Sequence, residues 1–174
     1  MHGRVIGIVL TSVALYLAGA TPAPTQEALD LNGAFVGAGL PTGWGPNQPG
    51  YWDEAGTVTL THIPDLEKSA VRLTSVAKAM SLYTSARQFA VSVGDKVVVK
   101  SLMRGAGAGS LGVYYYPGGG WLKKEFPVTT DWTEFAAELA IPEKVTHVRV
   151  VIGIPPCASA EFLDLRAQVI RTGR

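Results

Sequence analysis

Apolar and polar residues alternate along most of this chain with the two-residue period of β-strands. From residue 57 onward, short runs rich in Val, Thr, Tyr and Ile end at glycine or proline, and no window keeps apolar residues at helical spacing. The runs cover residues 57–62, 70–76, 96–104, 110–116, 121–128, 133–141, 146–154 and 161–170. They predict an all-β fold, an antiparallel jelly-roll β-sandwich of about eight to ten strands.

Residues 1–20 have the layout of a secretory signal peptide. His2 and Arg4 precede an almost wholly apolar run, and Ala-Gly-Ala at 18–20 offers small residues for cleavage. The run is shorter than a spanning helix needs, so we favour a cleaved signal over an uncleaved membrane anchor. We expect residues 21–28 to form a linker and 29–174 a single domain of a secreted or periplasmic/extracellular protein.

Composition excludes several other classes of protein. The chain has 174 residues, of which 47% are hydrophobic and 17% charged, which excludes a disordered chain. Its formal net charge is +1, and Arg4 is the only charge in the signal, so the remainder is neutral and does not suit nucleic acid. No later apolar run is long enough to span a membrane. The single Cys157 excludes an internal disulfide, and we expect it to be buried rather than paired between chains.

Residues 105–109 place three glycines between two strand-like runs, and we expect a hairpin turn there. Alternation then assigns each run an inner and an outer face. The expected inner residues are Val97, Val99, Ser101, Met103, Leu111, Val113 and Tyr115. If the two runs pair, one outer face carries Lys100, Arg104, Tyr114 and Tyr116.

Several short motifs occur in an order known from one family. They are residues 32–35 (Asn-Gly-Ala-Phe), 40–44 (Leu-Pro-Thr-Gly-Trp), 69–73, 91–104, 130–133 with Pro142, and 162–164 (Phe-Leu-Asp). In their order and spacing, from Asn32 to about Val169, the chain resembles the jelly-roll carbohydrate-binding modules that accompany cellulases and xylanases, within the galactose-binding-like sandwiches. The resemblance implies core positions for Trp44 and Trp132.

The resemblance also implies a structural calcium site, of which this sequence keeps little. Val36 follows the opening Phe, where the family often has an acidic residue, and Leu165 replaces the second Asp of the closing motif. Asp164 is left as the obvious side-chain ligand, whereas calcium takes about six to eight oxygens. We therefore expect no required cofactor, and only an incomplete calcium site at Asp164.

Signatures of catalysis are scarce. The chain has no H-E-x-x-H, G-x-S-x-G or P-loop motif, and we expect His62 and His147 to be polar surface residues. No two carboxylates have the spacing of a glycosidase pair. Polysaccharide lyases use a set of catalytic residues that includes a histidine. This sequence would supply about half of such a set, from Lys100, Arg104 and two tyrosines, but no histidine joins them. We expect no catalytic residues.

Aromatic residues are the positive signal, because a ring covers the C–H face of a sugar while polar groups bind its hydroxyls. We assign the candidate ligand site to Tyr51, Trp52, Lys100, Arg104, Tyr114, Tyr116 and Trp121. Structural alternatives stay open: Trp52 capping the sandwich, the tyrosines forming a cross-strand ladder, and the cations being solvated charges.

The leading hypothesis is a secreted, non-catalytic protein that binds a polysaccharide or oligosaccharide through an aromatic platform. One alternative is a structural or protein-interaction sandwich of the cell envelope, and another is a small polysaccharide-degrading enzyme. A near-neutral charge suits an uncharged polysaccharide. The fold class alone does not decide among these functions.

Overall fold

The computed structural model describes residues 23–31, 35, 40–46 and 52–172. This part of the chain is all-β, as predicted, with eleven strands and one short 3₁₀ turn, η1 (Pro64–Leu66). The strands are β1 (Thr25–Leu29), β2 (Trp44–Pro46), β3 (Thr57–Ile63), β4 (Lys68–Thr74), β5 (Met80–Thr84), β6 (Phe89–Ala90), β7 (Lys96–Tyr116), β8 (Gly120–Val128), β9 (Thr133–Ala140), β10 (His147–Ile154) and β11 (Ser159–Arg171). None of the described residues forms a helix long and apolar enough to cross a bilayer.

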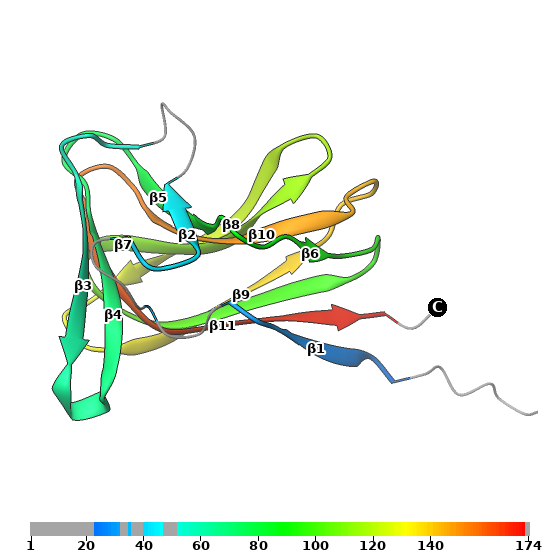
Figure 1. Cartoon of the computed structure of the whole chain (residues 1–174), viewed down its shortest axis with the longest axis horizontal. Coiled ribbons are helices and arrows are strands. Elements are labelled where there is room, and N and C mark those ends of the chain that lie inside the picture. Colours follow the sequence, from blue (N-terminus) through cyan, green and yellow to red (C-terminus); the bar gives the residue numbers. More distant parts are fainter. Residues whose placement is uncertain (1–22, 32–34, 36–39, 47–51, 173–174) are drawn as a thin grey trace, which may run out of the picture.

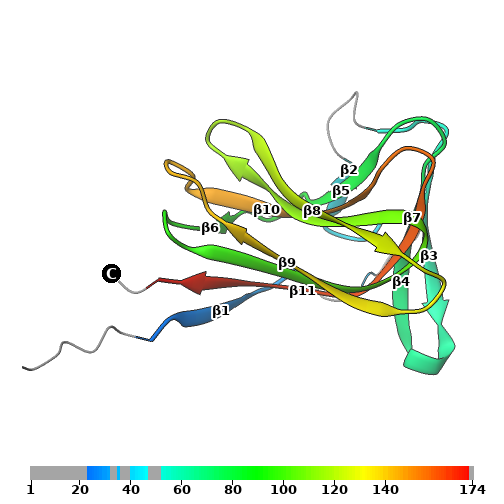
Figure 2. The ribbon, with the colours of Figure 1, turned by 180° about the vertical axis from the view of Figure 1, so that it is seen from behind.

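The strands form two antiparallel sheets, visible as two layers in Figure 1 and from behind in Figure 2. Sheet A has the order β3-β4-β11-β7-β9, with β1 beside the C-terminal half of β11. Sheet B has the order β2-β5-β10-β7-β8, with β6 beside the start of β10. Strand β7 belongs to both sheets and joins them.

The hairpin expected at residues 105–109 is wrong, because β7 runs unbroken for 21 residues. Its first half pairs with β9 and β11, and its second half with β8 and β10. Gly107 has φ 93°, and a Cβ on Gly105 would overlap the carbonyl oxygen of Ser159. The glycines therefore let β7 bend and lie close against β11 as it passes from one sheet to the other.

The hydrophobic core lies between the inner faces of the two sheets. The predicted inner residues Val97, Val99, Met103, Leu111 and Val113 are all fully buried. Ser101 and Tyr115 also point inward: the Ser101 hydroxyl donates to the Leu163 carbonyl (2.9 Å), and Tyr115 packs against the core. Alternation therefore predicted the faces correctly within each half of β7.

Trp44 and Trp132, both expected in the core, differ in where they lie. Trp44 is buried, and its ring centroid lies 5.7 Å from that of Phe35. Trp132 is only half-buried and lies on the outer face of sheet A, with the Arg104 guanidinium 4.5 Å from its ring centroid. The core position expected for Trp132 is therefore wrong.

Other local expectations also change. Residues 25–28, expected in a linker, belong to β1, which pairs with β11 from Thr25 opposite Arg171 to Leu29 opposite Ala167. Cys157 is exposed in a turn, so the expectation of burial is wrong. His62 and His147 are exposed, as predicted. The signal peptide expected at 1–20 lies outside the described residues.

Candidate functional site

Three of the predicted site residues meet on the outer face of sheet B. Tyr114 on β7 lies directly opposite Trp121 on β8, with ring centroids 5.1 Å apart. Its ring is also 4.8 Å from that of Tyr116. The ring planes cross at 73° and 69°, so the rings pack edge to face and form no flat platform.

Two further residues complete this group, and we call Tyr83, Tyr114, Tyr116 and Trp121, together with Arg149, the aromatic cluster. The Arg149 guanidinium lies 5.0 Å from the ring centroid of Tyr83 and 5.5 Å from that of Tyr116. The outward direction of Arg149 was predictable, because it alternates with the buried Val148 and Val150. Tyr83 was missed because β5 was not predicted.

The Tyr116 phenol of the cluster is uncharged at neutral pH. Burial raises the pKa of the Tyr116 phenol, and the positive charge of Arg149 lowers it by a smaller amount. The Tyr116 hydroxyl is therefore a neutral donor and acceptor beside a permanent cation.

A groove of about 200 Å³ adjoins the aromatic cluster on the same face. Trp121 and Lys123 lie along one side of it, and Met80 and Ile154 at the other. Its floor is made of small residues, which are Ser81, Ser110, Gly112, Val151 and Gly153.

The floor carries two serine side chains and two glycines, and no bulky polar side chain. Gly153 lies between Ser81 and Ser110 in the register of the sheet. A Cβ on Gly153 would lie 2.9 Å from the Met80 carbonyl oxygen and 3.1 Å from Ser110 Oγ, so a larger residue would crowd the floor at this point. Neither serine hydroxyl bonds to another described side chain or backbone group, and both remain available to a ligand.

The described residues of the groove offer binding groups but no acid–base pair. No Asp, Glu or His is found among the described residues that line it. Glu125, beside it on β8, forms an ion pair with Lys123 at 2.7 Å. A tryptophan ring and two serine hydroxyls suit a polyhydroxylated ligand with apolar faces.

Lys100 and Arg104 do not belong to this site. The bend in β7 places both on the outer face of sheet A, across the sandwich from Tyr114 and Tyr116, so the prediction of a shared face is wrong. Arg104 is paired with the buried Glu161, which Arg72 also contacts.

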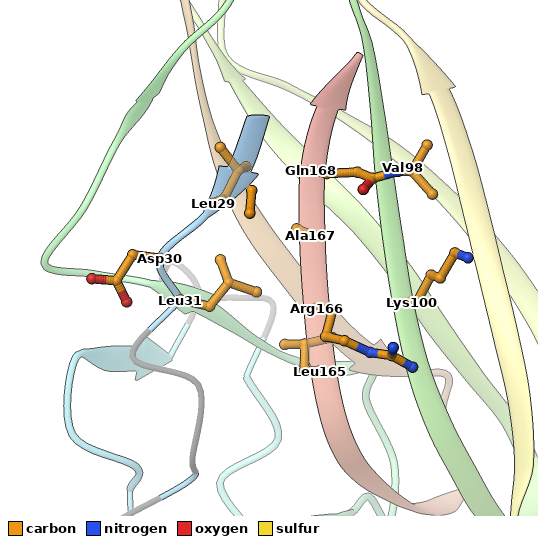
Figure 3. A pocket seen from close by; sticks show the side chains of 10 residues that line it. Leu29, Asp30, Leu31, Val98, Lys100, Leu165, Arg166, Ala167 and Gln168 are labelled. Carbon is orange, nitrogen blue, oxygen red and sulfur yellow. The ribbon is translucent and has the colours of Figure 1, made fainter. Parts of the chain in front are cut away.

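Lys100 instead borders a larger hollow of about 350 Å³ on sheet A. Figure 3 shows Leu29 and Leu31 on one side of β11, and Val98 and Lys100 on the other. None of the described residues that line this hollow is aromatic. It therefore lacks the ring that a sugar-binding site uses.

The loop before β3 has a structural role. Trp52 is half-buried and packs against the core, in accord with the capping alternative, while Tyr51 lies outside the described residues. The Asp53 carboxylate accepts backbone N–H bonds from Val76 and Ala77 at 2.7 Å, and also from Lys78 at 3.1 Å. These bonds lower the pKa of Asp53 to about 2.

Asp164 does not fit a calcium site. It has φ 53° where the register of β11 against β7 shifts, and its carboxylate lies 3.1 Å from Lys68 Nζ and 3.6 Å from Arg166 Nε. Two cations already neutralise this carboxylate. No group of three metal-binding side chains occurs in the part of the chain described. The expectation that no cofactor is required stays a prediction.

No protein-family model matches this sequence, and no curated protein is detected as a relative. Solved structures of similar fold include CBM29_1, a family 29 carbohydrate-binding module from Piromyces equi, at 14% identity and TM-score 0.51, covering 87% of this chain and 93% of that one. Another is BiXyn10A CBM1, at 15% identity and TM-score 0.50, covering 83% and 96%.

Two larger proteins contain a similar fold. The active domain of tailspike protein 4 from bacteriophage CBA120 has 10% identity and a TM-score of 0.56, and 80% of this chain covers 22% of it. The CBM22-1–GH10 modules of Clostridium thermocellum xylanase 10B have 15% identity and a TM-score of 0.52, and 75% of this chain covers 26% of them. This chain thus spans about a quarter or less of those two proteins. At identities of 10–15%, all four likenesses show one thing, a shared β-sandwich fold.

Proposed function

We propose that this protein binds a polysaccharide or oligosaccharide, without catalysis, in the groove on the outer face of sheet B. Trp121 beside a floor of glycine and serine carries the proposal. The indole ring covers the C–H face of a sugar, and the Ser81 and Ser110 hydroxyls bond to its hydroxyl groups. The absence of Asp, Glu and His from the described groove residues supports binding rather than hydrolysis.

Affinity electrophoresis on soluble glucans, xylans and mannans tests the proposal. We expect the folded protein to be retarded by at least one polymer, with no release of reducing sugar. Trp121→Ala should weaken that retardation about tenfold, because the ring contact with the sugar is lost.

Trp132→Ala is the matched control. Trp132 is also half-buried, but it lies on the outer face of sheet A against Arg104. We expect this variant to bind like the wild type. Equal losses in both variants, or no retardation of the folded wild type on any polysaccharide, including acidic ones, would contradict the proposed site.

A further inference from the structure

Arg149 has no counter-ion among the described residues, although it sits among aromatic rings on the outer face of sheet B. No Asp or Glu of the described chain pairs with it, whereas nearby Lys123 is neutralised by Glu125. Its Nε atom is buried and has no hydrogen-bond partner there. A half-buried cation in this state has lost part of its hydration without gaining an ion pair.

The stacking leaves only one part of the guanidinium open. The rings of Tyr83 and Tyr116 both lie against the group, at 5.0 and 5.5 Å, and Nε is enclosed. Both Nη atoms lack a partner among the described residues and are not enclosed, so they face solvent. Two coplanar N–H groups presented edge-on match the two oxygens of a carboxylate.

The groove leads to this group. Arg149 is two residues from the floor residue Val151 on β10, which is about 7 Å along the strand. Trp121 borders the groove and also contacts Tyr114, the residue opposite Arg149. A sugar chain lying along the groove therefore passes from Trp121 onto Arg149.

We propose that Arg149 binds the carboxylate of a uronic acid residue, so that the groove prefers an acidic polysaccharide over its neutral counterpart. This inference rests on the proposed carbohydrate-binding function and names its ligand class. A neutral hydroxyl also accepts an Arg N–H bond, but a carboxylate accepts two and supplies the missing charge. The formal net charge of the whole chain, only +1, gives no indication of this local cation.

The test compares each of two acidic polymers with a form of the same polymer that lacks the carboxylates. Polygalacturonate and glucuronoxylan are each paired with their carboxyl-reduced forms, and binding is measured by titration calorimetry at low salt. We expect the wild type to bind one acidic polymer about tenfold more tightly than its reduced form. The preference should shrink at high salt, because ions screen the pair.

Variants assign the preference to Arg149. Arg149→Gln should remove the preference, so that the ratio of the affinities for the acidic and the reduced form falls to about one. Lys124→Gln, which changes the net charge equally at an exposed site outside the groove lining, should keep the preference. Circular dichroism checks that each variant is folded.

The outcomes separate the two claims. Equal binding of acidic and reduced polymers by the wild type overturns the acidic preference and leaves the proposed function standing. A preference that survives in Arg149→Gln overturns the role of Arg149. Binding to none of these polymers or to the neutral panel overturns the proposed function as well.

Discussion

At the residue scale, Asp53 shows how a carboxylate next to a candidate ligand-binding residue, Trp52, can stabilise the fold. Its oxygens accept N–H bonds from residues 76–78 and from Ala55, so it ties the loop before β3 to the loop before β5. In the sequence, Asp53 directly follows Trp52, a candidate ligand-binding residue. The structure instead makes it an anchor for two loops.

The lowered pKa of Asp53 predicts a pH dependence of stability. The folded-state pKa of Asp53 is about 2, below the ordinary aspartate pKa of 3.8, so the ionised carboxylate stabilises the fold. This stabilisation should be complete above pH 4 and should be lost as the pH falls toward 2. Urea denaturation at several pH values should show that acidification lowers the free energy of unfolding less in Asp53→Asn than in the wild type. At neutral pH this variant is already the less stable of the two. The exposed neighbour variant Glu54→Gln should keep the wild-type profile, and an unchanged profile in Asp53→Asn would contradict the assignment.

Glu161 is a buried carboxylate on sheet A, the sheet opposite the proposed binding groove. It is 3% exposed and contacts Arg72 and Arg104, whose side chains are 48% and 34% exposed. We expect Glu161→Gln to lower the free energy of unfolding by about 1–3 kcal/mol, less than for a fully buried pair because both arginines reach water.

Glu134→Gln provides the comparison for Glu161. Glu134 pairs with Arg166 on the surface, where both side chains are about half exposed. Glu134→Gln should lower the free energy of unfolding by about 0–1 kcal/mol, measured by urea titration. If Glu161→Gln costs no more than Glu134→Gln, the buried pair does not stabilise the sandwich.

At the element scale, the bend in β7 determines which side chains share a face. We expect Gly105→Ala to be strongly destabilising, because its Cβ would overlap the backbone of β11 at Ser159. Gly109→Ala is the milder control, since its Cβ would meet the flexible Met103 side chain at 3.1 Å. Thermal unfolding should show a clearly larger loss for Gly105→Ala, and equal losses would mean that the close approach to β11 is not essential.

The same strand explains what the sequence predicted and what it did not. Alternation gave the inner residues of both halves, such as Val99 and Val113, because each half keeps an unbroken period of two. Alternation did not predict how one half of β7 is oriented relative to the other, because spaced glycines suit a turn and a bend equally well. Lys100 and Tyr114 were therefore placed together although they lie on opposite sides of the molecule.

At the scale of the whole molecule, the sandwich has two outer faces with different chemistry. Sheet B carries the aromatic cluster and the groove of about 200 Å³. Sheet A carries most of the ion pairs, including that of Glu161, and the larger hollow beside Lys100. Volume alone would favour sheet A, but Trp121 borders the groove on sheet B, whereas no described residue that lines the hollow beside Lys100 is aromatic.

Variants on the two faces decide between the hollows. We expect Lys100→Gln to bind polysaccharide like the wild type, because Lys100 lies across the core from the groove, while Trp121→Ala binds about tenfold more weakly. Affinity electrophoresis on the best-retarding polymer measures both variants on one gel. Lys100 has no side-chain partner among the described residues, so its replacement should leave the fold unchanged, which thermal unfolding checks. Weaker binding by Lys100→Gln alone would move the carbohydrate site to the hollow on sheet A, where an apolar wall of Leu29 and Leu31 would replace the aromatic ring.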